Sequence, residues 1–317
     1  MTKEATTLFI SIIIPCYNEE QVIRYTYERV HKTMNSFQHG GYELIFINDG
    51  SRDNTLAILK ELAANDNHTK VLSFSRNFGH QPAVTAGIQE CKGDVAIIID
   101  ADLQDPPELF PAMIEMHLHE NANVVYGMRE KRKGETFFKR ITAKSFYRFI
   151  NYLSDTNLPV DTGDFRLIDK HVIEAFKNLP EKNKYIRGLI SWIGFKQVPI
   201  MYVREERFAG ETKYPLSKMI KFASTSLLYF SKKPLKLALS LGFISILVGL
   251  GLGIWVITGL LFRPNTLVHG WASMVIAVIF FGGVQLLTIG VLGEYIGNMF
   301  EEIKNRPEYI IHEKVNF

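Results

Sequence analysis

The sequence predicts an α/β domain with a mainly parallel β-sheet and flanking helices, followed by two C-terminal transmembrane helices. Three observations predict this architecture. Short runs rich in Ile, Val and Phe alternate with helix-like segments over the first two thirds of the chain, two long apolar runs follow residue 235, and polar clusters come directly after four of the predicted strands. The 317 residues suggest roughly two units at ~150 residues each, and 47% hydrophobic with 22% charged residues exclude a disordered chain.

The predicted strands are the runs rich in Ile, Val and Phe, at residues 9–15, 42–48, 71–75, 95–100 and 123–127. Short continuous apolar runs are typical of strands that are buried on both faces. Between them, apolar residues at helical spacing predict helices, at residues 19–37, 54–64, 81–90 and 106–119. This alternation favours a mainly parallel sheet covered by helices on both faces. Such sheets bind ligands beyond the carboxyl ends of their strands.

The two apolar runs predict membrane-spanning helices. Residues 237–262 contain no charged, His, Asn or Gln side chain, and Gln285 is the only such side chain in residues 271–292. Each run exceeds the roughly 20 residues that cross about 30 Å of hydrocarbon. Buried core helices are the alternative, but they are rarely this long and uninterrupted.

The charges beside these runs predict their orientation. Lysines gather before the first run, at Lys213, Lys218, Lys221, Lys232, Lys233 and Lys236. Bases also follow the second run, whereas the segment between the runs holds only Arg263 and His269. The positive-inside rule then places both termini in the cytoplasm and the intervening segment outside. We expect no cleavable signal, because residues 1–7 carry an acid and a base and the apolar run 8–15 is too short.

The predicted organisation has six parts. They are a cytoplasmic domain at 1–212, a basic juxtamembrane amphipathic segment at 213–236, transmembrane helices at 237–262 and 271–293, an external loop at 263–270 and a cytoplasmic tail at 294–317. The glycine pairs Gly249/Gly253 and Gly293/Gly297 allow close helix contact and leave a homo-oligomer open. A net charge of +3 does not favour a nucleic-acid partner, and two cysteines exclude a disulfide framework or a Cys-based zinc site.

Four successive predicted strands end in polar clusters, at residues 17–19, 48–51, 76–80 and 100–104. One such cluster would be an ordinary turn, and residues 49–51 alone also fit a turn with a helix cap. Four clusters on one edge of a sheet predict a binding site. Asp105 is followed by two prolines, which predicts a helix N-cap with a structural role for this residue.

Asp100 and Asp102 predict a metal site. Two carboxylates that lie two residues apart directly after a buried strand repel each other unless a cation lies between them. A hard divalent cation, Mg²⁺ or Mn²⁺, that is shared with substrate phosphates supplies this charge. An EF-hand loop is excluded because Asp105 and Pro111 stand where it requires Gly and Glu, and the chain has no Walker or Rossmann motif. A metal–diphosphate site without these motifs points to sugar-nucleotide chemistry.

Three motifs, at residues 14–19, 48–53 and 100–108, resemble glycosyltransferase family 2. Residues 76–81 and 161–166 are similar to its polyprenyl-phosphate branch, which includes dolichol-phosphate mannose synthase. The two apolar runs add a resemblance to the bacterial bactoprenol (undecaprenyl-phosphate) glucosyltransferases. The resemblance implies a GT-A fold and a metal-dependent hexosyltransferase.

The resemblance also implies roles for single positions. The donor-binding residues would be Pro15, Tyr17, Glu19, Asp49, Gly79, Asp100, Ala101, Asp102 and Arg207. The metal would lie at Asp100, Asp102 and Gln104. The catalytic positions would be Asp164, Asp102 and Lys213, with Asp164 orienting the sugar or the nucleophile. The family often has Asp where this chain has Asn48, which leaves Asp49 as the one carboxylate of that pair.

Residues 129–148 are rich in Lys and Arg, with aromatic and aliphatic residues interleaved. This pattern, like that of residues 214–230, favours an amphipathic helix at an anionic membrane surface, and a solvated basic face is the alternative. The resemblance implies that Arg129, Arg140 and Ser145 hold the phosphate of a lipid acceptor.

The predicted activity is inverting transfer of glucose from UDP-glucose to undecaprenyl phosphate at the cytoplasmic face of the inner membrane, giving a β-linked product. The same chemistry with another sugar or with dolichol phosphate is one alternative, and a catalytically silent membrane scaffold is another. Intact Asp100, Asp102, Asp164 and Lys213 argue against the scaffold. A processive polysaccharide synthase is disfavoured, because the chain has no Gln-x-x-Arg-Trp segment and two spans are too few for a polymer channel.

Overall fold

The structure is a computed structural model that describes residues 7–129, 162–182, 184–204, 233–262 and 271–317. The chain divides into two compact units. The sheet unit comprises Met1–Ser145, Thr156–Pro215 and Arg306–Phe317, and the helical unit comprises Phe146–Asp155 and Leu216–Asn305. The end of the chain therefore belongs to the same unit as its beginning.

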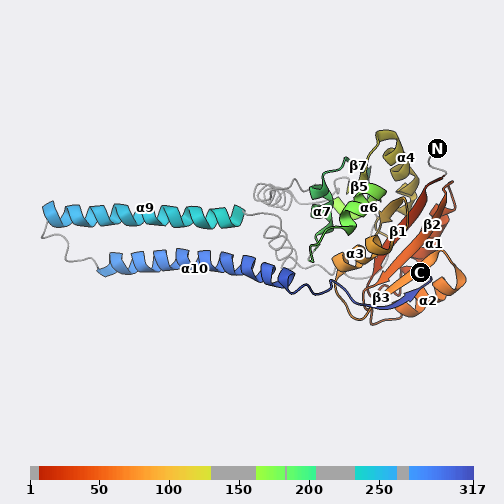
Figure 1. Ribbon diagram of the computed structural model, residues 1–317, viewed down its shortest axis with the longest axis horizontal. Helices are drawn as coiled ribbons and strands as arrows, with labels where there is room; N and C mark the ends of the chain where they lie inside the picture. The colour runs from red at the N-terminus through yellow and green to blue at the C-terminus, as the bar shows by residue number, and fades with distance from the viewer. Residues whose placement is uncertain (1–6, 130–161, 183, 205–232, 263–270) are drawn as a thin grey trace. The chain divides into compact units, whose positions relative to one another are not determined.

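The sheet unit is built around an eight-stranded sheet with the order β7-β5-β6-β4-β1-β2-β3-β8 (Figure 1). Its strands are β1 (Phe9–Cys16), β2 (Gly41–Asn48), β3 (Thr69–Phe74), β4 (Val95–Ile98), β5 (Val124–Arg129), β6 (Thr162–Asp169), β7 (Gln197–Tyr202) and β8 (Ile311–Val315). The four neighbours β4, β1, β2 and β3 are parallel, so their carboxyl ends share one edge. β6 runs antiparallel between β4 and β5, and β8 runs antiparallel beside β3.

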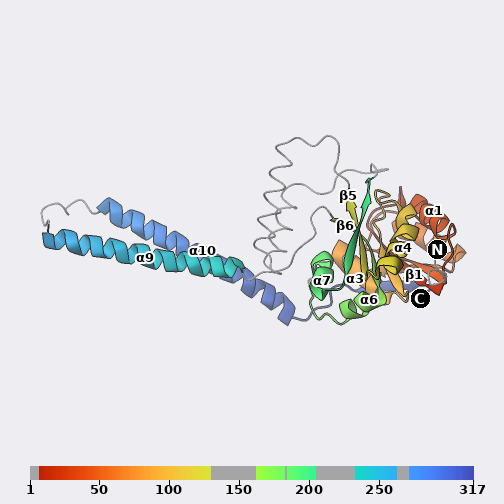
Figure 2. The ribbon, with the colours of Figure 1, turned by 90° about the horizontal axis from the view of Figure 1, so that it is seen from above.

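The helices lie on both faces of the sheet, as predicted (Figure 2). They are α1 (Ile23–Met34), α2 (Thr55–Asn65), α3 (His80–Glu90), the short 3-10 helix η2 (Pro107–Leu109), α4 (Phe110–Glu120), α6 (Lys170–Lys177) and α7 (Ile186–Ile193). On one face, side chains of α1, α2 and α4 join a core cluster with alternate residues of β1 and β2. α3 packs on the opposite face, where a side chain at Gly87 would meet Ile13 and Ile47.

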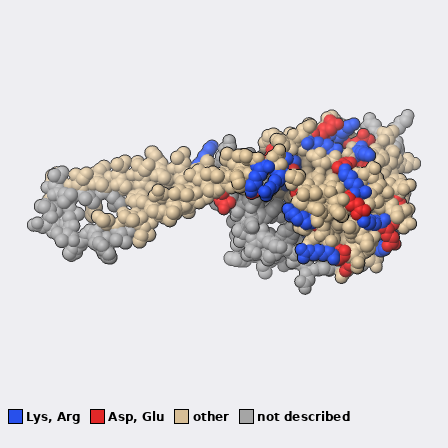
Figure 3. All heavy atoms as spheres, turned by 60° about the horizontal axis from the view of Figure 1, so that its bottom comes forward, with Lys and Arg blue, Asp and Glu red and all other residues tan. Residues whose placement is uncertain are grey.

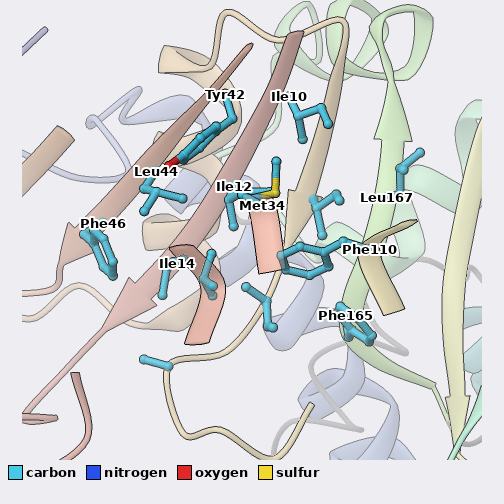
Figure 4. Close-up of a cluster of buried hydrophobic side chains, with 14 of the residues drawn as sticks. Ile10, Ile12, Ile14, Met34, Tyr42, Leu44, Phe46, Phe110, Phe165 and Leu167 are labelled. Atoms are coloured by element: carbon cyan, nitrogen blue, oxygen red, sulfur yellow. The ribbon is translucent and has the colours of Figure 1, made fainter. Parts of the chain in front are cut away.

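The core explains why the Ile-rich runs form strands. Ile10, Ile12 and Ile14 of β1 are fully buried against Met34 of α1 and Phe110 of α4 (Figure 4). Because side chains alternate along a strand, Ile13 is buried on the other face. Burying both faces of a central strand contributes roughly 1.5–3 kcal/mol per large aliphatic side chain, which favours this register over a one-residue slip.

The prediction of an α/β fold with a mainly parallel sheet is confirmed, and the five predicted strands correspond to β1–β5. The predicted helices correspond to α1, α2, α3 and η2 with α4. β6, β7 and β8 were not predicted as strands. Thr162–Asp169 mixes charged and apolar residues, and its Asp164 and Arg166 are nevertheless buried. Local sequence does not reveal such burial, because it depends on partners elsewhere in the chain.

The helical unit contains two long apolar helices, α9 (Lys233–Phe262) and α10 (Trp271–Ile303). Leu235–Trp255 and Ala277–Ile303 are long and apolar enough to cross a membrane. Many of their large apolar side chains are exposed, and the face that Figure 3 shows carries few charged side chains along these helices. An exposed apolar surface of this kind is typical of contact with a bilayer or another apolar partner. α10 extends past residue 293 into the predicted tail, which also contains β8.

The predicted glycine contacts are only partly present in the described residues. A side chain at Gly249 would lie 3.5 Å from the ring of Phe281 on α10, whereas nothing lies within 4 Å of such a side chain at Gly253, Gly293 or Gly297. The last three glycines therefore do not mediate α9–α10 packing, and a homo-oligomer through them stays a prediction.

Candidate active site at the carboxyl edge of the sheet

The four predicted polar clusters lie at the same edge of the sheet, because the strands that precede them are parallel neighbours. The clusters after β1 and β2 bind each other directly. The Asn18 amide donates to Ser51 Oγ at 3.0 Å, and the Arg52 amide donates to Asn18 Oδ1 at 2.9 Å. Asn18 has φ 54°, a left-handed conformation that Asn tolerates better than most residues. These bonds fix the loop that holds Tyr17 and Glu19.

Asp49 connects the cluster after β2 to the cluster after β3. Its carboxylate accepts hydrogen bonds from the Phe78 amide at 2.7 Å, the Gly79 amide at 2.9 Å and Asn77 Nδ2 at 2.9 Å. Burial raises the pKa of this carboxyl, and the two amide hydrogen bonds oppose the rise. Asp49 thus shapes the loop before α3, and its predicted role in donor binding stays a prediction.

Gly50 allows these two loops to approach each other. Its φ is +62°, and a Cβ at this position would lie 2.3 Å from the carbonyl carbon of Arg76. Glycine has no Cβ, so it alone avoids both the strained conformation and the clash. Gly79, with φ +109°, immediately precedes α3 and starts the helix that carries His80 and Gln81.

Asp164 on β6 is held by side chains from two helices. Arg187 on α7 approaches its Oδ1 through Nε at 2.6 Å and its Oδ2 through Nη2 at 3.2 Å. His80 Nε2 lies 2.9 Å from Oδ2, and Gln81 Nε2 lies 3.5 Å from it. Burial acts to raise the pKa of Asp164, but the charge of Arg187 and the bond and charge of His80 bring it well below its usual range. Asp164 is therefore a fixed carboxylate anion.

His80 joins Asp164 to the metal-site candidate. Its Nε2 lies 3.8 Å from Asp100 Oδ1 as well as 2.9 Å from Asp164 Oδ2. Burial lowers the pKa of His80, but the charges of Asp100 and Asp164 outweigh burial and raise the pKa to about 9. His80 and Arg187 were not predicted as site residues. His80 lies inside a recognised motif, but no local signal marks Arg187, which reaches the site only through the packing of α7.

The predicted metal residues lie in the loop after β4. Burial raises the pKa of Asp100 to about 6; His80 opposes this rise, and the nearby carboxylates Asp164, Asp105 and Asp102 add to it. Asp102 Oδ1 accepts from the Gln104 amide at 3.1 Å, and its Oδ2 lies 3.9 Å from Arg204 Nη2. Carboxylates are thus concentrated where the sequence predicts a cation.

A divalent cation fits this donor set. Within the described ranges, no group of three His, Cys, Asp or Glu side chains is placed to hold an ion by itself. Mg²⁺ and Mn²⁺ sites that use one or two carboxylates and complete the shell with water and substrate phosphate need no such group. The buried Asp105 Oδ2 also has no hydrogen-bond partner among the described residues. The chemistry of the loop therefore suits a cation shared with a diphosphate.

Asp105 does not cap a helix, so that prediction was wrong in its detail. The 3-10 helix η2 follows Pro106 and has no side-chain cap bond, and Asp105 instead accepts a hydrogen bond from the hydroxyl of Tyr202 on β7. Asp105 is fully buried and lies 3.7 Å from Arg204 Nε. Its role is still structural, because it joins the loop after β4 to the end of β7.

Arg129 is the one predicted lipid-phosphate residue that the structure describes. It lies at the end of β5, where its Nε is 3.4 Å from the Tyr202 hydroxyl, and a side chain at Gly163 would meet its Nη2 at 2.8 Å. Arg129 thus lies next to the strand that carries Asp164. The other predicted acceptor residues, Arg140 and Ser145, lie outside the described residues, as do Arg207 of the donor site and the catalytic candidate Lys213.

The remaining predicted donor residues lie around the same edge. Pro15 is in β1, and Tyr17 and Glu19 follow that strand, where the Glu19 amide donates to Thr55 Oγ1 at 2.9 Å. The Ala101 carbonyl accepts from Thr26 Oγ1 of α1 at 2.8 Å. The loops after β1 and β4 are thereby fixed to α2 and α1.

Residues 11–176, which include this edge of the sheet, match the family described as Glycosyl transferase family 2. The chain belongs to glycosyltransferase family 2. The fold is accordingly GT-A-like, as the sequence predicts, and this family 2 enzyme is a transferase. β6, with Asp164, lies within the matched residues.

Several relatives resemble this glycosyltransferase over nearly its full length. The uncharacterized glycosyltransferase YkcC of Bacillus subtilis is 48% identical over 303 residues, which cover 96% of this chain and 93% of the relative. A bactoprenol glucosyl transferase of Shigella phage SfII is 41% identical over 305 residues, covering 95% and 97%. A prophage bactoprenol glucosyl transferase homolog of Escherichia coli is 40% identical over 304 residues, covering 95% and 98%.

The similarity to solved structures is lower. Glucosyl-3-phosphoglycerate synthase from Mycobacterium tuberculosis, crystallised with Mn²⁺, UDP and phosphoglyceric acid, has a TM-score of 0.46 and 18% identity, and the match covers 70% of this chain and 76% of that one. The family assignment rests on the sequence matches alone.

Proposed function

We propose that this glycosyltransferase transfers glucose from UDP-glucose to undecaprenyl phosphate, a polyprenyl phosphate, and forms a β-linked lipid-phosphate sugar. The observation that carries the proposal is a similarity of about 40% identity, over nearly the full length, to proteins named bactoprenol glucosyl transferase. The two apolar helices lie on the same chain and suit a lipid acceptor.

The donor diphosphate would lie over the loop after β4. Asp100, Asp102 and Gln104 would hold Mg²⁺ or Mn²⁺ there, and such a cation would supply positive charge to the leaving diphosphate. Pro15, Tyr17, Glu19, Asp49 and Gly79 come from the three neighbouring strand ends, and together with Ala101 of the loop itself they would hold the nucleotide. Arg207 and Lys213, from outside the described residues, would complete the donor site.

The phosphate group of the acceptor is itself the nucleophile. A phosphate monoester is largely dianionic at pH 7 because its second pKa is about 6, so the attack needs no strong general base. Asp164 is fixed as an anion by Arg187 and His80, and it would orient the sugar or the attacking phosphate. One in-line displacement inverts the anomeric centre, so an α-linked donor gives a β-linked product.

The acceptor phosphate would be held by Arg129 with Arg140 and Ser145. Arg129 suits this role because a guanidinium presents several donors that match phosphate oxygens. The lipid tail requires the site to open at a membrane surface, and we place the enzyme in the inner membrane with its sheet unit and both termini in the cytoplasm. The lysines between residues 213 and 236 favour this orientation.

The test is a donor panel with purified full-length enzyme in detergent. Labelled UDP-glucose, UDP-galactose, UDP-N-acetylglucosamine and GDP-mannose are each incubated with undecaprenyl phosphate and Mg²⁺ or Mn²⁺, and the lipid product is identified by mass. We expect a hexosyl lipid phosphate from UDP-glucose alone. A product only from another donor would refute the choice of UDP-glucose, and Asp164→Asn is the inactive control.

A further inference from the structure

The last residues of the chain form part of the sheet unit. β8 pairs with β3, with Val315 opposite Val71 and Lys314 opposite Leu72. Figure 1 shows the C-terminal strand lying beside β3. Tyr309, just before β8, stacks on Phe74 of β3 with 4.9 Å between the ring centroids. The segment is therefore a structural element of the sheet rather than a free tail.

Glu308 in this segment forms a buried ion pair with Lys184. Lys184 Nζ lies 2.5 Å from Glu308 Oε1, and the two side chains are only 6% and 9% exposed. Leu179, Pro180, Pro307 and Tyr309 line the same pocket as the pair. Both side chains are largely shielded from water, so removing one of them is expected to be unfavourable for the buried charge that remains.

Lys184 lies two residues before α7, the helix that supplies Arg187. At the start of α7 the Ile186 amide donates to Gln81 Oε1 at 3.0 Å, and Arg187 then binds both oxygens of Asp164. Gln81 also approaches Asp164, at 3.5 Å. The start of α7 is thus held by Gln81, through the Ile186 amide, and by Glu308, through Lys184 two residues before the helix.

We propose that Glu308 is a positioning residue for the reaction: through Lys184 it fixes the start of α7, so that Arg187 holds Asp164 in its working orientation. This inference rests on the proposed function, because it assigns Asp164 to the reaction. α10 ends at Ile303, so only residues 304–307 separate an apolar helix from the residue that supports the active site. The C-terminal segment therefore connects the apolar helix α10, along the chain, to the residue that positions α7.

The test compares Glu308→Gln and Lys184→Met with a control pair on the same segment. Lys60 and Glu313 form a 2.6 Å ion pair that joins β8 to α2, with side chains 42% and 37% exposed. Lys60→Met and Glu313→Gln therefore remove a tether of the same segment without touching the support of Arg187. The charge-exchanged double variant K184E/E308K restores a pair of opposite charges.

Two readouts are needed, on full-length enzyme in detergent. Because small displacements of a positioned group can cost about 10²-fold in rate, we expect kcat to fall roughly 10- to 100-fold in Glu308→Gln and Lys184→Met, with the donor KM within about threefold of wild type. K184E/E308K should exceed both single variants in kcat, and the control variants should stay within about twofold of wild type. Wild-type kcat in Glu308→Gln and Lys184→Met would overturn the proposal, as would equal losses in the controls.

The second readout does not require activity. Hydrogen exchange of amides 185–190 should accelerate in Glu308→Gln and Lys184→Met and not in Lys60→Met or Glu313→Gln. Unchanged exchange there would overturn the proposal even if activity falls. If wild-type enzyme transfers no sugar to undecaprenyl phosphate, the proposed function fails, and exchange still reports whether Glu308 fixes α7.

Discussion

Arg187 and Asp164 form an ion pair at the carboxyl edge of the sheet, with 2.6 Å between Nε and Oδ1. Asp164 comes from β6 and Arg187 from α7, and the carboxylate is only 8% exposed. A buried carboxylate of this kind requires a fixed partner, because an unpaired charge in the interior is strongly unfavourable. The pair therefore links the stability of the sheet unit to the geometry of the site.

Arg187→Ala should destabilise the sheet unit by about 3 kcal/mol, because it leaves the buried Asp164 without its main partner. It should also lower kcat/KM at least roughly 100-fold. Thermal unfolding in detergent and donor kinetics measure the two effects. Arg24→Ala, which removes an exposed ion pair with Glu61, is the control and should unfold at the wild-type temperature. Equal unfolding temperatures for both variants would contradict a supporting role for Arg187.

Asp102→Ala should abolish metal-dependent turnover if this carboxylate holds the cation at the diphosphate. A loss of about 10²–10³-fold in kcat is expected when one source of transition-state charge stabilisation is removed. Titration calorimetry with UDP should show that Mn²⁺ no longer strengthens nucleotide binding. Glu61→Gln removes an exposed carboxylate of α2 that is not one of the predicted metal residues, and it should behave as wild type in both assays. Metal-dependent UDP binding that survives in Asp102→Ala would exclude Asp102 as a ligand.

Gly50→Ala should destabilise the sheet unit by about 3 kcal/mol, since it combines a positive φ with a Cβ 2.3 Å from the Arg76 backbone. Gly194→Ala is the matched control. Gly194 has φ +83°, but its nearest neighbour lies at 3.8 Å, so only the conformational cost of about 1–2 kcal/mol applies. The unfolding temperature of Gly50→Ala should be well below that of Gly194→Ala. The reverse order would mean that the loops after β2 and β3 do not approach each other at Gly50 and Arg76.

Asp66 should stabilise the enzyme at neutral pH and not in acid. Burial raises the pKa of Asp66, but hydrogen bonds from the His68 amide, the His68 ring and the Thr69 and Tyr27 hydroxyls together lower it. A depressed folded-state pKa gives stability above the unfolded value of about 3.9, and the stability is lost as pH falls through the folded pKa. Wild type should therefore exceed Asp66→Asn in unfolding temperature at pH 7, and the gap should narrow below about pH 4. A difference in unfolding temperature that does not change with pH would refute the depressed pKa of Asp66 as its origin.

Residues 263–270 should face the exterior. In intact cells a membrane-impermeant maleimide should label Thr266→Cys, because α9 and α10 are expected to cross the bilayer on either side of it. Asn67→Cys, on the exposed surface of the sheet unit, should be labelled only after lysis. Both native cysteines are buried, which keeps background labelling low. Labelling of position 67 but not position 266 in intact cells would reverse the orientation.

The sequence alone determined the elements whose signal is local. Continuous Ile, Val and Phe runs predicted β1–β5 because central parallel strands are buried on both faces, and length with apolarity predicted α9 and α10. The four polar clusters could be placed on one edge because the strands of a parallel sheet all end on the same side. Asp100 and Asp102 were found because their spacing is a local pattern.

The tertiary structure decided what depends on distant partners. Asp164 meets Arg187 and His80 only because β6 lies antiparallel beside β4 and α7 packs nearby, and no local pattern encodes that arrangement. The local sequence of Asp105 is typical of an N-cap, but the residue is buried beside β7. Its carboxylate there accepts a hydrogen bond from the Tyr202 hydroxyl instead. The pairing of β8 with β3 likewise depends on the path of the whole chain. Local sequence fixes burial periodicity and turns, whereas contacts between distant residues follow from topology.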